Sequence, residues 1–154
     1  MGLRYIGSKA RIADKIIDIL GMHSDDDGTF VDAFSGTGVV AEKAAISGWP
    51  VKINDQMRSS LYISNARLIG KDEAQFKCLN CYKKTTQYLN DLPKKQGFFW
   101  KEYSPASKNF CGVERKYFTE ENAMHIDAIR AEIKHLSISG LINDIEHSLL
   151  LADL

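Results

Sequence analysis

The hydrophobic and polar positions in the first half of the chain predict a short series of alternating helices and strands. Residues 9–20 hold apolar side chains at helical spacing, and the predicted helix stops at Gly21. Residues 29–34 form an apolar run typical of a buried strand, and residues 49–55 form a second strand with a polar end. Residues 39–45, between the two strands, have high helix propensity. This order predicts a βαβ unit and a mostly parallel sheet.

The rest of the chain is predicted to be largely helical. A helix over residues 59–68 completes the first half, and the prolines and glycines of residues 90–112 predict a loop-rich segment. Thr119 is a good N-cap for a helix that ends near residues 137–140. The apolar positions of that helix are Ile126, Ile129, Ile133 and Leu136. Residues 141–154 predict a last helix, with an apolar stripe of Ile142, Ile145, Leu149 and Ala152.

Composition places the chain among ordinary globular proteins. It has 154 residues, 20 basic and 20 acidic side chains, and 44% hydrophobic residues, which excludes disorder and fibrous repeats. No apolar run approaches the ~20 residues of a membrane span, and the first residues lack a signal-peptide core. Three cysteines, an odd number, are expected to be free thiols in a reducing cytoplasm. We therefore expect a cytoplasmic protein without a membrane partner.

The balanced charge hides a basic and aromatic segment. Residues 76–118 contain nine basic and three acidic side chains, and ten of the fifteen aromatic residues of the chain. Such interleaving suits a surface that contacts phosphates and stacks on bases. A solvated lysine-rich face over an aromatic core is the alternative, and composition alone favours it.

A glycine turn and an acidic residue suggest a nucleoside site. Gly36 and Gly38 lie between the first strand and its helix, where they let a ligand approach the backbone and the helix N-terminus. Asp55 ends the second strand, 17 residues after Gly38, where a carboxylate can accept hydrogen bonds from two ribose hydroxyls. A turn with two glycines alone often has only a structural role. Together with Asp55 it favours binding of an adenosine-type ligand.

The charge near the turn separates two candidate ligands. The spacing Gly36-x-Gly38-x-x-Ala41 also fits a dinucleotide site. However, Asp32 lies four residues before the first glycine, and an anion there repels a pyrophosphate and attracts a sulfonium or ammonium group. Phe34 suits an apolar wall better than a phosphate cradle. We therefore favour S-adenosylmethionine over NAD.

Four segments resemble Dam-like adenine-specific DNA methyltransferases. Residues 4–9 (RYIGSK) resemble the N-terminal motif X of that family, residues 30–38 (FVDAFSGTG) resemble motif I, and residues 53–55 (IND) resemble motif II. Residues 115–130 are similar to a stretch found in part of the family. The resemblance implies an α/β, incomplete Rossmann-like S-adenosylmethionine-dependent methyltransferase fold. Residues 1–75 would form its cofactor-binding part and residues 76–154 a helical recognition segment.

The resemblance also implies roles for individual residues at the cofactor site. Lys9 would pair with the methionine carboxylate of S-adenosylmethionine, and Tyr5 would pack nearby. Asp32 would face the amino group of the cofactor, and Asp55 would hold its ribose. The pocket would be lined by Phe34 and by the turn from Gly36 to Gly38.

The basic segment falls where this family builds target recognition. Its lysines are therefore candidates to contact the phosphates of double-stranded DNA, which supplies sequence-independent affinity. These candidates are Lys83, Lys84, Lys94, Lys95 and Lys101.

The family's catalytic motif is missing from the sequence. An Asp-Pro-Pro-Tyr motif holds the flipped adenine in that family, whereas Pro50, Pro93 and Pro105 of this chain are not adjacent. We name no catalytic residue, and expect the N-terminal portion of a restriction-modification adenine methyltransferase that is inactive without a downstream catalytic part. A split enzyme completed by a second polypeptide, a truncated gene product and a shortened version of a longer chain all fit.

Other interpretations stay open. Cys78, Cys81, Cys111 and His125 match no common zinc module, so no metal site is expected. A NAD-binding dehydrogenase domain and a non-catalytic DNA-binding remnant are the alternative functions.

Overall fold

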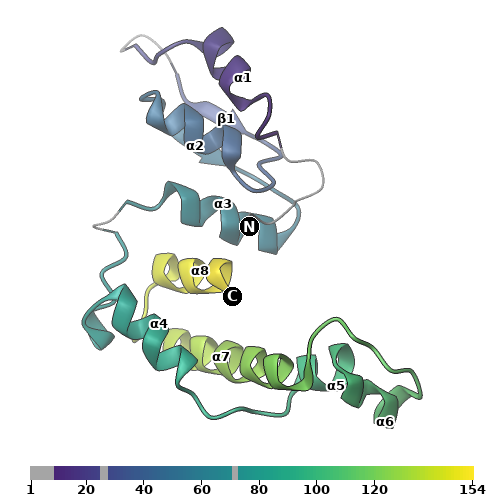
Figure 1. Cartoon of the computed structure of the whole chain (residues 1–154). Coiled ribbons are helices and arrows are strands. Elements are labelled where there is room, and N and C mark those ends of the chain that lie inside the picture. Colours follow the sequence, from purple (N-terminus) through teal and green to yellow (C-terminus); the bar gives the residue numbers. More distant parts are fainter. Residues whose placement is uncertain (1–8, 25–27, 71–72) are drawn as a thin grey trace. The chain divides into compact units, whose positions relative to one another are not determined.

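The computed structural model describes residues 9–24, 28–70 and 73–154. The chain divides into two compact units (Figure 1). Unit 1 comprises the chain up to Ala74 together with Leu151–Asp153, and unit 2 comprises Gln75–Leu150 and Leu154. Helices dominate both units, and none of the described helices is long and apolar enough to cross a membrane.

Unit 1 contains the predicted βαβ unit. Strands β1 (Phe30–Asp32) and β2 (Val51–Ile53) pair in parallel, with Phe30 opposite Val51 and Asp32 opposite Ile53. Helix α2 (Val39–Ile46) connects the strands and packs on both of them. Helices α1 (Ala13–Leu20) and α3 (Arg58–Leu68) pack against α2. The parallel pairing is therefore confirmed, as a sheet of two strands.

The strands of unit 1 are shorter and less buried than the sequence predicts. Each has three residues, and the central residue of β1, Val31, is 59% exposed. Successive strand residues point to opposite faces, so Phe30 and Asp32 are half-buried on one face while Val31 lies on the other. An uninterrupted apolar run did not distinguish a strand buried on both faces from one buried on a single face.

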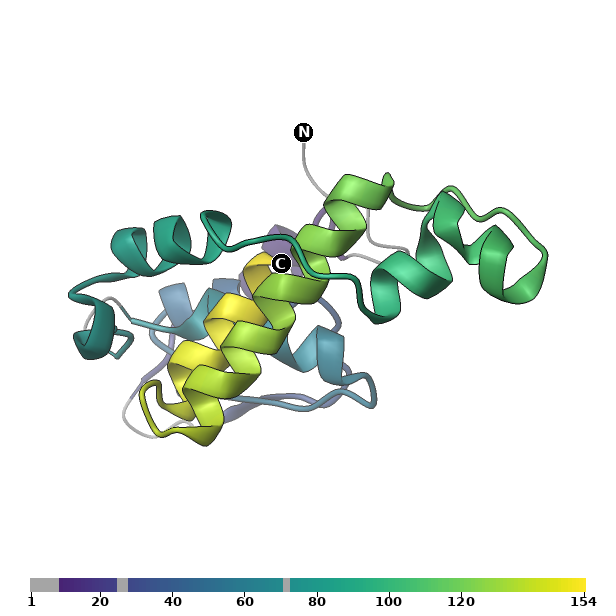
Figure 2. The same cartoon turned by 90° about the horizontal axis from the view of Figure 1, so that it is seen from below.

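Unit 2 is helical. Its elements are η1 (Lys77–Leu79), α4 (Tyr82–Asn90), α5 (Phe98–Tyr103), η2 (Pro105–Ser107), α6 (Lys108–Cys111), α7 (Glu120–Ile138) and α8 (Asp144–Asp153). The long helix α7 packs against α4 and α5, and α5 and α6 both contact η2 (Figure 2). The last residues of α8 group with unit 1.

The prediction that residues 90–112 are rich in loops is wrong, because more than half of this segment is helical. Its glycines and prolines mark helix ends. Gly97 precedes α5, Pro105 occupies the first turn of η2, and Gly112 ends α6 with a φ of 73°. Proline at a first turn and glycine after a last turn are ordinary helix signals. Because these helices are very short, the signals resemble those of a loop.

The structure confirms the predicted start and end of α7. The Thr119 hydroxyl accepts a hydrogen bond from the Asn122 N–H at 3.2 Å, and Gly140 follows the helix with a φ of 67°. Ile133 and Leu136 are buried as predicted. Asp127 of the same helix is also buried, although the apolar pattern does not include it.

The predicted apolar stripe of the last helix is confirmed only at Ile142, which is buried just before α8. Ile145 is 37% exposed and Leu149 only half-buried, whereas Glu146 and Leu150 are buried. The Glu146 carboxylate accepts hydrogen bonds from the N–H groups of Phe76 and of the N-cap residue Asn143. Two backbone donors compensate the cost of burying this carboxylate, which lets the helix turn a charged residue inward.

Candidate functional site

The turn between β1 and α2 has a left-handed backbone at both of its glycines. Gly36 and Gly38 have φ values of 52° and 74°, in the left-handed region that favours glycine. The Gly38 N–H donates to the Ser35 carbonyl oxygen at 2.7 Å, which closes the turn. Gly38 is the N-cap of α2, and no described side chain caps that helix. The turn therefore brings an uncapped helix N-terminus close to the ends of the strands.

Gly38 also allows a close approach of α3. A Cβ atom at position 38 would lie 2.7 Å from the Ser64 Cβ and 2.8 Å from its Cα. Ser35, Ser60 and Ser64 are buried around this contact, and the Ser35 and Ser64 hydroxyls lie 3.4 Å apart. Glycine at 38 is thus required by the packing of α3, independently of any ligand.

Asp55 ties the end of β2 to the glycine turn. Its Oδ2 accepts a hydrogen bond from the Gly36 N–H at 2.8 Å, and its Oδ1 accepts one from the Met57 N–H at 2.9 Å. These bonds to Met57 and Gly36 outweigh partial desolvation and lower the pKa of the Asp55 carboxyl from its ordinary value of 3.8. The carboxylate is therefore ionised at neutral pH and is a hydrogen-bond acceptor beside the turn.

The backbone joins the two strand ends as well. The Asn54 N–H donates to the Asp32 carbonyl oxygen, and the Ser35 N–H donates to the Asn54 carbonyl oxygen, both at 2.9 Å. The Asn54 side chain donates to the Ala33 carbonyl oxygen at 2.9 Å. Asp32 and Asp55 therefore end neighbouring parallel strands at one edge of the sheet.

Among the described residues, the other predicted cofactor residues are not bonded to the glycine turn or to Asp55 through their side chains. Phe34 is 79% exposed next to the turn, and Lys9 is exposed before α1. Within the described parts of the chain, no hydrogen bond or ion pair joins the side chains of Lys9, Asp32 or Phe34 to Asp55. Tyr5 lies outside the described residues. The structure thus brings together the turn and Asp55, the two features on which the sequence argument depends most.

The predicted DNA-contacting lysines of unit 2 are all exposed. Lys83 and Lys84 lie on α4, and Lys94 and Lys95 lie between α4 and α5. The Lys94 ammonium is paired with Glu121. The Lys101 ammonium, on α5, lies 5.2 Å from the centre of the Phe110 ring. These lysines therefore differ in how much of their charge is already neutralised.

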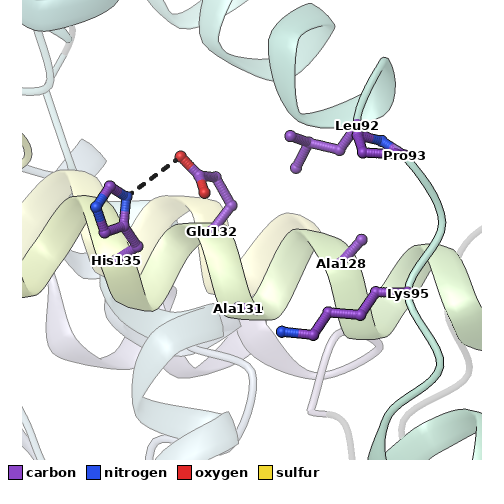
Figure 3. A pocket seen from close by; sticks show the side chains of 7 residues that line it. All are labelled: Leu92, Pro93, Lys95, Ala128, Ala131, Glu132 and His135. Atoms are coloured by element: carbon purple, nitrogen blue, oxygen red, sulfur yellow. Dashed lines mark ion pairs between the residues drawn. The ribbon is translucent and has the colours of Figure 1, made fainter.

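A pocket of about 300 Å³ lies along α7, between this helix and the segment after α4 (Figure 3). Leu92 and Pro93 form one wall. Across from them, His135 Nδ1 lies 3.5 Å from the Glu132 carboxylate. That carboxylate accepts a 2.8 Å hydrogen bond from Tyr88, which raises the pKa of the Tyr88 phenol. Lys95 lines the same pocket, so its surroundings contain both signs of charge.

Sequence reasoning missed two buried carboxylates that organise unit 2. Asp127 accepts hydrogen bonds from the N–H groups of Phe99 and Trp100, both at 2.9 Å, at the start of α5. Glu146 binds the backbone of Phe76, which is fully buried with a φ of 48°. The donors lie 27 to 70 residues away from the carboxylates. No local pattern contains a signal for such contacts.

The cysteines are free thiols. Among the described residues, no group of three or more His, Cys, Asp or Glu side chains could hold a metal ion.

Comparison with known proteins identifies the family. The model of the D12 class N6 adenine-specific DNA methyltransferases matches residues 5–151. Because the match covers nearly the whole sequence, the chain belongs to this family. The resemblance found in the sequence motifs is thereby confirmed.

Three relatives are each similar over almost all of this chain. It is 35% identical to Modification methylase LlaI of Lactococcus lactis subsp. lactis, over 99% of its length. It is 33% identical to Type II methyltransferase M.NlaIII of Neisseria lactamica over 99%, and 34% identical to Type II methyltransferase M.FokI of Planomicrobium okeanokoites over 97%. The matches cover 24%, 44% and 23% of these relatives, so the chain spans less than half of their lengths. No solved structure matches the chain.

Proposed function

We propose that this chain is the N-terminal portion of a site-specific DNA adenine methyltransferase of a restriction-modification system. Its family and the names of its relatives, modification methylases and type II methyltransferases, support this function. Bound S-adenosylmethionine would supply the methyl group that is transferred to the exocyclic amine of adenine. Unit 1 would bind this cofactor, and unit 2 would contact double-stranded DNA.

The cofactor site would lie at the glycine turn, in an incomplete Rossmann-like fold. The observation that carries this proposal is the Asp55 carboxylate, fixed by the N–H groups of Gly36 and Met57. A carboxylate has about four acceptor positions, and the Ser60 hydroxyl and the Gln56 N–H interact with this one more weakly than Gly36 and Met57 do. Ribose hydroxyls would take the place of these weaker partners. The lowered pKa of Asp55 keeps it in the ionised, acceptor-only form. The uncapped N-terminus of α2 and the acceptor chemistry of Asp55 therefore fit an adenosine-bearing ligand.

The remaining cofactor contacts are proposed from the sequence motifs. Lys9 would pair with the methionine carboxylate, with Tyr5 packed nearby. Asp32, at the end of β1, would attract the positively charged amino group of the ligand. Phe34, largely exposed beside the turn, offers the apolar wall.

The test is calorimetric titration of the chain with S-adenosylmethionine and, separately, with NAD. We expect S-adenosylmethionine to bind and NAD not to bind. Asp55→Ala should weaken binding about tenfold or more, because the ribose hydroxyls would lose a charged hydrogen-bond acceptor. Asp18→Ala removes the same charge from an exposed position on α1 and should have no effect. Binding of NAD alone, or equal binding by wild type and Asp55→Ala, would contradict the proposed site.

The catalytic motif would come from outside these 154 residues, from a downstream segment or a second polypeptide. The sequence contains no adjacent prolines and therefore no Asp-Pro-Pro-Tyr motif. We expect the chain alone to transfer no labelled methyl group to DNA, and a polypeptide that carries the motif to restore transfer when added. Efficient methylation by the chain alone would show that this proposal is wrong.

A further inference from the structure

Unit 2 exposes a set of aromatic rings among basic side chains, here called the aromatic–basic surface. Its members are Phe98, Lys101, Phe110, Lys116 and Tyr117. Tyr117 is 74% exposed, Phe98 61% and Phe110 51%. Large aromatic rings are usually buried, so three exposed rings within residues 98–117 indicate a binding function.

The exposed rings are supported by other aromatic rings. Tyr103 packs edge-on against Phe98 and against Tyr117, with ring centres 5.7 Å and 5.8 Å apart. Phe99 lies 5.6 Å from Tyr103 and 6.0 Å from Phe118. Phe98 and Tyr117 are therefore the two exposed ends of one continuous cluster of rings.

Hydrogen bonds fix the backbone that carries this cluster. The Asp127 carboxylate binds the first N–H groups of α5, and the Phe118 N–H donates to the Tyr103 carbonyl oxygen at 3.1 Å. The Arg115 guanidinium donates to the carbonyl oxygen and the carboxylate of Glu102 at 2.9 and 3.0 Å. A surface held in this way loses little conformational entropy when it binds a ligand.

The charge around the rings favours a nucleic acid over a protein partner. Residues 97–118 contain four basic and two acidic side chains. Glu102 is paired with Arg115 and Glu114 with Lys116, so the net positive charge of this segment comes from Lys101 and Lys108. The Lys101 ammonium lies over the Phe110 ring, so a cation and an aromatic face are presented together. Base stacking with adjacent phosphate contacts uses this combination.

We propose that the aromatic–basic surface stacks on nucleobases exposed where DNA is locally opened, with Tyr117 as the principal ring. In an intact duplex each base face is covered by its neighbours, so an aromatic side chain can stack only where a base has left the stack. This inference rests on the proposed function, because an enzyme that modifies adenine must open the duplex to reach it.

The test is fluorescence anisotropy of the 154-residue chain with three oligonucleotides of the same sequence. They are an intact duplex, a duplex with one unpaired base, and a single strand. Tyr117→Ala should weaken binding to the last two about tenfold, since stacking contributes ~1–3 kcal/mol per base. Binding to the intact duplex should change less than about twofold, and the salt dependence should not change, because no phosphate contact is lost.

Two further variants separate stacking from a general loss of structure. Tyr117→Phe keeps the ring and should retain wild-type binding. Ile138→Ala, which truncates an equally exposed apolar side chain at 75% exposure on α7, should have no effect. Equal binding of Tyr117→Ala and wild type, or an equal loss on all three DNAs, would overturn the inference alone. If wild type binds no DNA while it binds S-adenosylmethionine, both this inference and the DNA-contacting role of unit 2 fail.

Discussion

The two units achieve their folds by different kinds of contact. Unit 1 has a core of small residues, such as Ala13, Ala41 and Ala44, and leaves large side chains such as Ile19 and Phe34 exposed. Unit 2 is organised by aromatic rings and by buried carboxylates that bind distant backbone N–H groups. Close backbone approach therefore dominates in unit 1, and side-chain networks dominate in unit 2.

This difference predicts different sensitivities. Small side chains bury little apolar area, so unit 1 should be less stable by itself and should gain more from a bound ligand. The two tryptophans allow each unit to be followed separately, because Trp49 lies in unit 1 and Trp100 in unit 2. Replacing either one by Phe leaves a single fluorescent reporter of unfolding.

The largest effect is expected for Asp127→Ala in unit 2. Loss of this carboxylate leaves the N–H groups of Phe99 and Trp100 without their acceptor, at a cost of about 3 kcal/mol. Urea unfolding followed by Trp100 fluorescence measures the change. Glu114→Ala, which breaks only an exposed pair with Lys116, is the control and should be nearly neutral. A similar small effect of both substitutions would show that the buried carboxylate does not organise α5.

A smaller loss, of about 2 kcal/mol, is expected for Gly38→Ala in unit 1. The added methyl group meets the backbone of Ser64, and the residue must keep a φ of 74°. Gly112→Ala is the matched control, because Gly112 has a φ of 73° and a ψ of −4°, close to the φ of 74° and ψ of 14° at Gly38, and nothing lies within 4 Å of an added Cβ. Each variant is followed by thermal unfolding with the tryptophan of its own unit, Trp49 for Gly38→Ala and Trp100 for Gly112→Ala, and the excess loss at position 38 measures the close approach of α3. If both variants lost the same stability, the whole effect would come from backbone strain.

Acidification should lower the stability of unit 1, because Asp55 becomes protonated. Because the folded-state pKa of this carboxyl is lowered below 3.8, its contribution to stability is complete above that pH. The contribution decreases as the pH falls from 3.8 through the folded-state pKa. Thermal unfolding of wild type and Asp55→Asn between about pH 3 and pH 7 tests this. The difference between the two proteins should shrink at the acidic end, and a difference independent of pH would contradict the assigned hydrogen bonds.

The smallest expected effect separates two lysines of unit 2. Lys84→Ala should reduce the slope of DNA affinity against salt concentration by about 0.9, the value for one phosphate contact. Lys94→Ala should change it less, because Glu121 already neutralises Lys94. Titrations at several salt concentrations measure both slopes. Equal reductions would indicate that DNA displaces Glu121 from Lys94.

The sequence predicted much of the element order, and its errors have physical causes. Helix α7 is defined by local signals, the Thr119 cap and the glycine that follows its end, so its limits were predictable. In α5 and α6, glycine and proline act as helix ends, although in short segments they resemble loop residues. At the candidate site, the glycine turn and Asp55 were predictable from their spacing, because strand and helix lengths fix their separation along the chain.

Local composition and spacing by themselves determined the parallel βαβ order and the glycine turn with its acidic partner, and the resemblance of sequence motifs indicated the adenine methyltransferase family. Only the tertiary structure showed three contacts. Ser64 packs against Gly38, the buried Glu146 carboxylate of α8 binds the Phe76 N–H, and the Asp127 carboxylate binds the Phe99 N–H at the start of α5. Each of these contacts joins residues more than 20 positions apart. These contacts depend on how the helices and strands pack in space. The hydrophobic periodicity of one segment does not specify which distant residues it will contact.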